Sequence, residues 1–170
     1  MYYFISDEHY GHKNIIKYEN RPFETVEEMN KTIISNHNEV VGKNDITVHA
    51  GDFTLGNKKY AASIITQLNG NHIFIEGSHD SWLNGKSKQI WERRIQEHYF
   101  VVCHYAMRVW SRSHYNSIQL FGHSHGNLKP IGKQWDLSVE NNNYYPLSEN
   151  QILEIMKNRP DNPNLIKQNS

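Results

Sequence analysis

Long apolar runs and cysteine pairs are both missing from this sequence. It contains no run of about 18 apolar residues, which excludes a membrane-spanning helix. The apolar start from Met1 to Ile5 gives way to Asp7 too soon for a signal peptide, which needs a basic start and a longer apolar stretch. The one cysteine, Cys103, excludes an internal disulfide and fits a reducing compartment. We therefore expect a cytoplasmic protein that makes no use of a membrane.

An excess of charge of one sign is missing too. Lys and Arg together number 18, as do Asp and Glu. A neutral chain has no general electrostatic attraction for duplex nucleic acid. A length of 170 residues is typical of one domain, and neither an internal repeat nor a low-complexity linker divides it. We expect one domain over 1–158 and a polar tail over 159–170. Length and composition predict no particular oligomeric state.

Predicted strands and helices alternate along the first half of the chain. Strands are expected at 2–5, 46–49, 72–76, 118–121 and 135–139, and helices at 26–41, 58–68 and 149–158. Thr25 with Glu28, and Ser148 with Gln151, form capping boxes. The stretch 87–102 has features of both a helix and a strand. The early alternation predicts an α/β core, and the later strands predict a second sheet.

Five short blocks of metal-binding residue types follow the predicted strand ends. They are Asp7-Glu8-His9, Gly51-Asp52, Gly77-Ser78-His79-Asp80, His104 and Gly122-His123-Ser124-His125. Open α/β sheets place their sites at the carboxyl ends of strands, where distant segments converge. The carboxylates and imidazoles of the blocks are enough to hold two divalent metal ions. Mn²⁺ is the preferred ion, and Fe, Ni, Zn or Mg would also suit such mixed donors.

The order of these blocks resembles that of the calcineurin-like metallophosphoesterases. That family has Asp-x-His, Gly-Asp, Gly-Asn-His followed by Asp or Glu, a lone His, and Gly-His-x-His. The runs 7–16, 104–107 and 136–146 are similar to a compact branch found in bacteria and phages. The resemblance implies an α/β fold, a four-layer αββα sandwich of two mixed β-sheets flanked by helices. It also implies hydrolysis of a phosphodiester or phosphomonoester by a hydroxide that bridges two metals.

The resemblance further implies a role for each block. The first metal would be bound by Asp7, His9, Asp52 and His125, and the second by Asp52, Ser78, His104 and His123. His79 would donate a proton to the leaving oxygen, and Asp80 would orient His79. The departure from the family is Ser78, which stands where the pattern has Asn. Because a serine hydroxyl is shorter and a poorer donor than an amide oxygen, weaker binding of the second metal is expected.

Residues outside the blocks suggest how a substrate would bind. His12 and Asn14 follow the first ligands and either contact the substrate or fix the loop. Arg108 follows His104 and either grips a phosphate or lies in a surface loop. Trp110 either stacks on a base or covers the core. The expected partner is a small phosphoester, with a nucleotide as the favoured candidate.

Structural roles are expected for the remaining polar residues near these motifs. Arg21 belongs to a helix-entry loop, and Glu8 points away from the ligands that flank it. His37 is assigned to the surface or to a helix face. His49 and His72 lie within predicted strands, where packing or hydrogen bonding accounts for them.

Two other classes of function stay open. If Ser78 disables the second site, the chain is a metal-dependent module that binds a nucleotide or a protein without hydrolysing it. A structural metal domain is the third possibility. It would be favoured if chelation unfolded the chain while no phosphate ligand bound.

Overall fold

Twelve helices and strands make up the chain over residues 1–85 and 87–166, which the computed structural model describes. Residues 167–170 of the expected tail lie outside this part. The elements are β1 (Tyr2–Ile5), α1 (Ile15–Tyr18), α2 (Val26–Val40), β2 (Ile46–His49), α3 (Lys58–Ile65), β3 (Asn71–Phe74), β4 (Ile90–Ile95), β5 (His98–Cys103), β6 (Ile118–Phe121), β7 (Gln134–Asp136), β8 (Leu147–Ser148) and α4 (Glu149–Lys157). Short 3₁₀ helices occupy Ser81–Leu83, Ser113–Tyr115 and Val139–Asn142.

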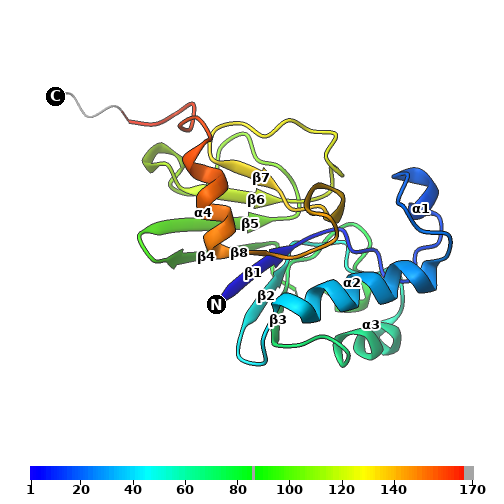
Figure 1. The fold of residues 1–170 in the computed structure, drawn as a ribbon. Coiled ribbons are helices and arrows are strands. Elements are labelled where there is room, and N and C mark those ends of the chain that lie inside the picture. The colour runs from blue at the N-terminus through cyan, green and yellow to red at the C-terminus, as the bar shows by residue number, and fades with distance from the viewer. Residues whose placement is uncertain (86, 167–170) are drawn as a thin grey trace.

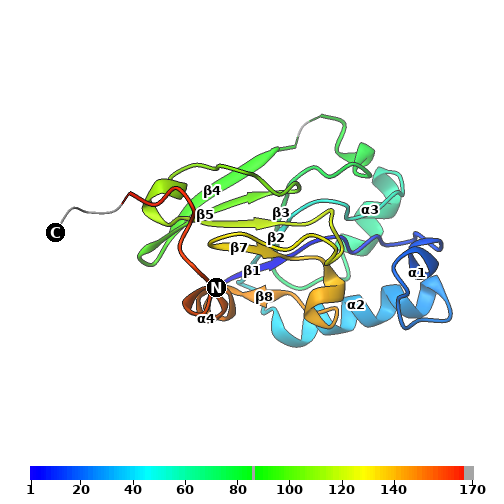
Figure 2. The same cartoon turned by 90° about the horizontal axis from the view of Figure 1, so that it is seen from above.

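Two mixed sheets of four strands each form the framework, as the fold class predicted (Figures 1 and 2). The first sheet has the order β3-β2-β1-β8, in which β8 is antiparallel to β1 and the other pairs are parallel. The second has the order β4-β5-β6-β7, in which β4 is antiparallel to β5 and the other pairs are parallel. Each sheet therefore contains three parallel strands that end at one edge.

Apolar side chains from both sheets meet in one core. The rings of Phe4 in β1 and Phe100 in β5 stack with centroids 5.5 Å apart. Val48 from β2 and Leu120 from β6 are fully buried in the same cluster. Alternate residues of a strand point to opposite faces, so the neighbours of these residues face outward from the pair of sheets.

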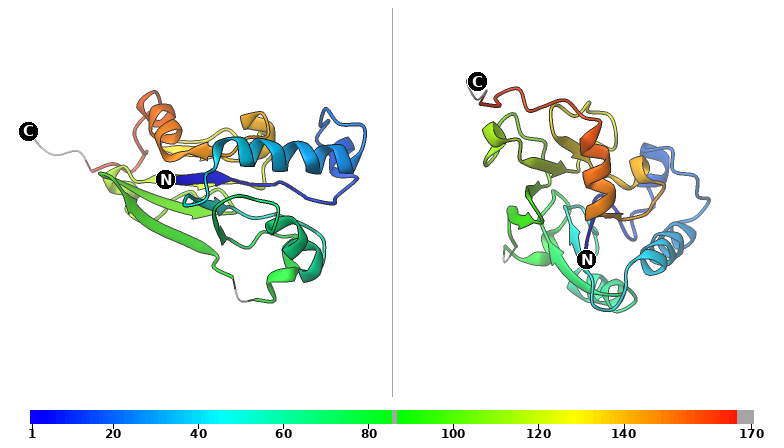
Figure 3. Two further views of the ribbon diagram at one scale, coloured as in Figure 1. Left: turned by 60° about the horizontal axis from the view of Figure 1, so that its bottom comes forward. Right: turned by 60° about the vertical axis from the view of Figure 1, so that its left-hand side comes forward.

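Helices α2 and α3 lie side by side on the outer face of the first sheet (Figures 1 and 3). Their buried residues Met29, Ile33 and Ile64 pack with Tyr10 and Phe53, which follow the two central strands. Helix α4 lies beside β8 and inserts Ile152 and Met156 at the edge of the core between the sheets (Figure 1). Among the described residues, no helix is long and apolar enough to span a membrane.

The outer face of the second sheet is covered by the segment 104–117. Gln119 of β6 donates to the carbonyl of Tyr105, and Gln134 of β7 donates to that of Met107. Trp110 is buried, and its indole N–H donates to the carbonyl of Ser117 at 3.1 Å. Trp110 therefore covers the core, and the alternative that it stacks on a base is wrong.

Several predicted element bounds need correction. The ambiguous stretch 87–102 forms the hairpin of β4 and β5, because Trp91 and Ile95 pack between the sheets. Helix α3 ends at Ile65, three residues early, although Leu68 is still buried. Thr25 caps α2, but Glu28 accepts from the amide of Glu24, so this capping box is incomplete. The one at Ser148 is complete.

The carboxyl ends of the parallel strands of both sheets meet at one edge. Beyond β1, Ser6 pairs with Ser138, which follows β7, and the amide of Val139 donates to the Ser6 carbonyl. The amide of Gly122 likewise donates to the carbonyl of His104, which follows β5. All five sequence blocks lie on loops at this edge, so the fold itself brings them together.

Candidate metal centre

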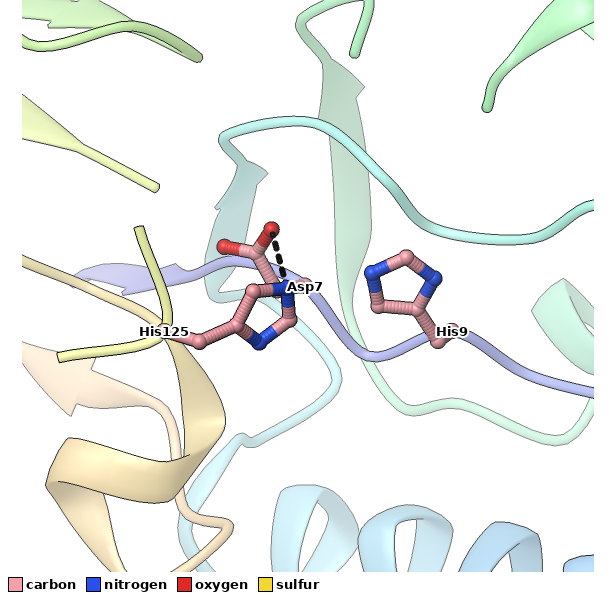
Figure 4. A group of neighbouring side chains, drawn as sticks. All are labelled: Asp7, His9 and His125. Atoms are coloured by element: carbon pink, nitrogen blue, oxygen red, sulfur yellow. Dashed lines mark ion pairs between the residues drawn. The ribbon is translucent and has the colours of Figure 1, made fainter. Parts of the chain in front are cut away.

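One group of potential metal ligands joins the two sheets. Asp7 and His9 come from the loop after β1, and His125 comes from the loop after β6 (Figure 4). One ligand atom from each of the three lies within 4.8 Å of the others. The Nε2 atom of His125 is 3.7 Å from Asp7 Oδ1. A single dication could bind all three side chains.

A second group is centred on Asp52, which follows β2. Ligand atoms of Asp52, His104 and His123 lie within 4.8 Å of one another. The same carboxylate forms a further group with His9 and His79. Its Oδ2 atom is 3.4 Å from Nε2 of His104, 3.7 Å from that of His9 and 3.9 Å from that of His79. Asp52 therefore connects the two groups, as a bridging ligand would.

Left-handed backbone conformations aim these side chains. Asp7, His9, Asp52, His123 and His125 all have φ between +45° and +67°. For residues other than glycine this conformation is uncommon, and it is frequent at functional sites. Each loop thus turns sharply just after its strand and presents the side chain at the sheet edge.

Two glycines of the blocks are required by close contacts. A Cβ atom at Gly51, where φ is +97°, would lie 2.4 Å from Nδ1 of His104. A Cβ atom at Gly122 would lie 1.9 Å from the Ser6 hydroxyl and 2.4 Å from Asp7 Oδ2. Only glycine allows these loops to approach the ligands so closely.

The carboxylate of Asp7 is held by three neighbours. Its Oδ2 atom accepts from the hydroxyls of Ser6 and Ser138 at 2.6 and 3.0 Å, and from the amide of His123 at 3.0 Å. Burial raises the pKa of Asp7 to about 7, although His125 and His104 act to lower it. The amide of His123 also donates to Oδ1 at 3.0 Å, and Oδ1 is turned towards the ring of His125 (Figure 4).

The hydrogen bonds of the histidine rings leave nitrogen atoms that are suited to bind a metal ion. The Nε2 atoms of His9 and His104 are buried and have no hydrogen-bond partner within the described part of the chain. Nδ1 of His104 is 2.9 Å from the carbonyl of Ala50, which requires a proton on Nδ1 and leaves a lone pair on Nε2. Burial lowers the pKa of His9 to about 2, so this ring is neutral. Unpartnered, unprotonated nitrogens beside a carboxylate are what a dication needs.

Asp52 carries the negative charge of the centre. Burial alone would raise the pKa of Asp52, but His104, His9 and the amide of His79 hold it below its ordinary value. The Ser78 hydroxyl donates to Asp52 Oδ2 at 3.2 Å, so Ser78 lies beside the second group. Its role as a ligand of the second metal, and the weaker binding expected there, stay predictions.

Asp80 is hydrogen-bonded to the loop that follows β2. Its buried carboxylate accepts from the amides of Asp52, Phe53 and Gly77 at 2.7 to 3.0 Å, and from the indole of Trp82 at 3.0 Å. Asp80 therefore supports the backbone that carries Asp52, and its expected orientation of His79 stays a prediction. His79 is half-exposed, and its own amide donates to Asp52 Oδ1 at 2.8 Å.

The expected substrate residues are placed differently from one another. His12 lies beside the centre, with its Nδ1 atom 3.4 Å from that of His9 and its ring near that of His79. Asn14 is exposed at the start of α1, and Arg108 is exposed on the segment after His104. A substrate contact by any of the three stays a prediction.

Two residues that support the centre were missed. Glu140, in the 3₁₀ helix 139–142, lies 3.1 Å from Nδ1 of His125. Arg21, assigned to a helix-entry loop, is buried and forms an ion pair with Glu140 at 2.6 Å. The two are 119 positions apart, so no local pattern connects them.

Three neighbouring histidines, two of them buried, lie around β2. His49 in β2 contacts the carboxylate of Glu8 at 2.5 Å and Nδ1 of His72 at 3.0 Å. Hydrogen bonding thus accounts for both strand histidines, as expected. His37 is buried rather than exposed, with its Nε2 atom 3.0 Å from the carbonyl of Asn69. The helix-face alternative for His37 is confirmed, because α2 turns this residue towards the sheet, and the surface alternative is wrong.

The pKa values of the ligands predict that metal binding depends on pH. Asp7, with a pKa of about 7, holds a proton below that pH. Burial alone would lower the pKa values of His104 and His125, but their carboxylate neighbours raise both above the ordinary value. A dication must displace these protons, so affinity should rise with pH. We expect Mn²⁺ to bind the full chain at least about 10-fold more weakly at about pH 6 than at about pH 8.

Equilibrium titration with Mn²⁺, followed by the electron paramagnetic resonance signal of the free ion, measures this change. Asp7→Asn removes one of the displaced protons, so its weaker binding should have a shallower pH dependence. Equal affinity of the natural chain at both pH values would contradict the prediction.

Comparison with known proteins finds several solved structures that are similar to this chain. No family model matches it. The Aquifex aeolicus protein of unknown function AQ665 has the same fold, with a TM-score of 0.71 and 23% identity over 91% of this chain and 98% of that one. Two structures have lower TM-scores, each with 15% identity over 81% of this chain: a mutant of Vps29 from Entamoeba histolytica at 0.46, and a predicted phosphoesterase from Streptococcus pneumoniae at 0.43.

The sequence relationship is closer to an archaeal protein. The uncharacterised protein MJ1445 of Methanocaldococcus jannaschii is 37% identical over 164 residues, which cover 91% of this chain and 90% of that protein. Identity at this level over nearly the full length of both indicates common descent and a common fold. The chain therefore belongs to the same family as MJ1445.

Proposed function

We propose that this chain is a metal-dependent phosphoesterase. It would hold two divalent ions, of which Mn²⁺ is the preferred kind. It would hydrolyse a phosphodiester or a phosphomonoester, and nucleotides are among the candidate substrates. The position of Asp52 Oδ2 carries the proposal, since it faces Nε2 atoms of His9, His104 and His79 at 3.4 to 3.9 Å. The order of the sequence blocks supports it independently. Cys103 is buried and unpaired, which fits a reducing compartment, so we propose that the activity is cytoplasmic.

Different residues of the chain would have different roles in such a reaction. Bound dications would supply a nucleophile from water at neutral pH and offset charge on the phosphate oxygens. Asp7, His9 and His125 would hold one ion, His104 and His123 would hold the other, and Asp52 would contribute to both. The left-handed loops turn these donors towards the shared sheet edge.

His79 is the residue suited to the leaving group. It is half-exposed, unlike buried His9 and His104, and its Nε2 atom is 3.9 Å from Asp52 Oδ2. A ring in that place is open to substrate on one side and close to the bridging carboxylate on the other. His79 would therefore donate a proton to the leaving oxygen, a role that commonly contributes about 10²- to 10⁴-fold in rate.

Hydrolysis of an aryl phosphodiester and an aryl phosphomonoester in the presence of Mn²⁺ tests the proposal. We expect metal-dependent release of the aryl group by the natural chain. His79→Ala should lower kcat by about 10²- to 10⁴-fold, with Mn²⁺ binding retained. His98→Ala, which changes an exposed histidine at the opposite end of β5 from His104, is the matched control and should leave kcat unchanged.

The alternative functions give other results. Tight binding of a nucleotide in the presence of Mn²⁺ without release of product would favour a binding module, in which Ser78 weakens the second site. Unfolding by a chelator, together with no affinity for inorganic phosphate, would favour a structural metal domain. Either outcome would exclude the phosphoesterase.

A further inference from the structure

A buried arginine and a carboxylate from a distant segment meet behind the ring of His125. Glu140 Oε1 lies 3.1 Å from Nδ1 of His125. The same oxygen accepts from Nε of Arg21 at 2.8 Å and lies 2.6 Å from its Nη2. Glu140 Oε1 thus joins the first group of ligands to a residue that precedes α2.

Arg21 also holds the loop that carries the other two ligands of that group. Its Nη2 atom donates to the carbonyl of Asp7 at 2.7 Å, and its Nη1 atom donates to that of Glu8 at 3.0 Å. The Arg21 side chain has no exposed area. A buried cation is stable only with a partner of opposite charge, and Glu140 supplies it. The planar guanidinium suits this task, because its donors diverge in a fixed geometry.

The contact with Glu140 decides which nitrogen of His125 is available. A carboxylate accepts a hydrogen bond, so the proton of the neutral ring lies on Nδ1 and the lone pair lies on Nε2. Nε2 is the atom that is 3.7 Å from Asp7 Oδ1 (Figure 4). Glu140 therefore fixes both the rotation of the ring and the nitrogen that it presents to the centre.

We propose that Glu140 and Arg21 are positioning residues of the first metal site: Glu140 orients His125, and Arg21 ties Glu140 to the loop of Asp7 and His9. This inference rests on the metal binding in the proposed function, and it adds two residues to which the sequence blocks assign nothing. It also explains why the segment 136–140 belongs to the site, since Ser138 on the same segment holds Asp7.

Binding of Mn²⁺ alone tests the inference without reference to turnover. Glu140→Gln keeps the size of the side chain but removes the charge that partners Arg21. Loss of such supporting contacts commonly weakens metal affinity by about 10- to 100-fold. We expect the natural chain to bind two Mn²⁺ ions, and Glu140→Gln to bind one of the two more weakly by that factor. The free-ion resonance signal measures both affinity and stoichiometry.

Glu149→Gln is the matched control. Glu149 also joins two distant segments, because it accepts from the amide of Tyr2 at 2.7 Å, but it lies at the opposite end of β1 from Asp7. This variant should bind both ions as the natural chain does. A purely structural role for Glu140 would lower the melting temperature of the metal-free variant and leave the affinity of the folded protein unchanged, and that result would overturn the inference.

Arg21→Lys keeps the test decisive if Glu140→Gln does not fold. Lysine retains the charge beside Glu140 but cannot reach Glu140 and both carbonyls at once. Arg21→Lys should bind one of the two Mn²⁺ ions more weakly than the natural chain does, and unchanged affinity for both ions would overturn the inference.

The proposed function and this inference fail in different ways. Two bound Mn²⁺ ions without hydrolysis of any phosphoester would reject the phosphoesterase and leave the positioning role supported by the Glu140 result. Hydrolysis and unchanged affinity in Glu140→Gln would reject the positioning role alone. A natural chain that bound no Mn²⁺ would reject both.

Discussion

Replacing Asp52 by asparagine should weaken binding of Mn²⁺ by at least about 100-fold and reduce phosphoester hydrolysis by at least as much. The shape of the side chain is kept, but its charge is lost. Asp52 Oδ2 faces Nε2 atoms of three histidines, so no other residue of the centre has an equivalent position. Because variants that only support a ligand commonly cost about 10- to 100-fold, loss of a ligand shared by two ions should cost more. Mn²⁺ titration and release of an aryl group measure the two effects.

Asp45→Asn is the appropriate comparison for Asp52→Asn. Asp45 lies just before β2, whereas Asp52 lies just after it. The carboxylate of Asp45 accepts from the N-terminal amine at 2.8 Å and from the amide of Gly42 at 2.9 Å. This variant removes a hydrogen-bonded carboxylate without touching the centre, and it should bind Mn²⁺ normally. If Asp52→Asn retained two tightly bound ions, the bridging role of Asp52 would be wrong.

The second large effect is expected in stability rather than in metal affinity. Asp80→Asn should lower the free energy of unfolding of the metal-free chain by at least about 3 kcal/mol. The buried carboxylate accepts from the amides of Asp52, Phe53 and Gly77 and from Trp82 Nε1. An asparagine amide group would turn a donor towards these donors and leave some of them unpaired. Urea denaturation in the presence of a chelator measures the loss.

His79→Ala provides the contrast for Asp80→Asn. His79 is half-exposed, so its removal should change the free energy of unfolding by less than about 0.5 kcal/mol while it reduces turnover. If Asp80→Asn were as stable as the natural chain and lost turnover to the same extent as His79→Ala, Asp80 would act through the ring of His79. That result would support the role implied by the resemblance.

The sequence alone predicts the ligands of the centre better than their supports. Asp7, Asp52 and the histidines of the blocks follow strands whose apolar pattern is strong, and parallel strands end at one edge, so their convergence could be predicted. The bounds of β1, β2 and β6 follow from the same short apolar runs.

What could not be predicted depends on contacts between distant segments. Arg21 and Glu140 find each other across 119 positions, and nothing near either residue indicates the pairing. The support that Asp80 gives to the amides after β2 could not be predicted, because these amides lie 26 to 28 positions away from it. The sequence does not decide between the surface and a helix face for His37, because only packing against the sheet distinguishes the two.

The left-handed backbones of the proposed ligands also limit how this protein can evolve. A residue other than glycine in that conformation costs on the order of 1 kcal/mol, and five of the ligands adopt it. Glycine at those positions would relax the loops and remove the donors together. Selection for heat resistance alone would therefore favour substitutions that erase the centre.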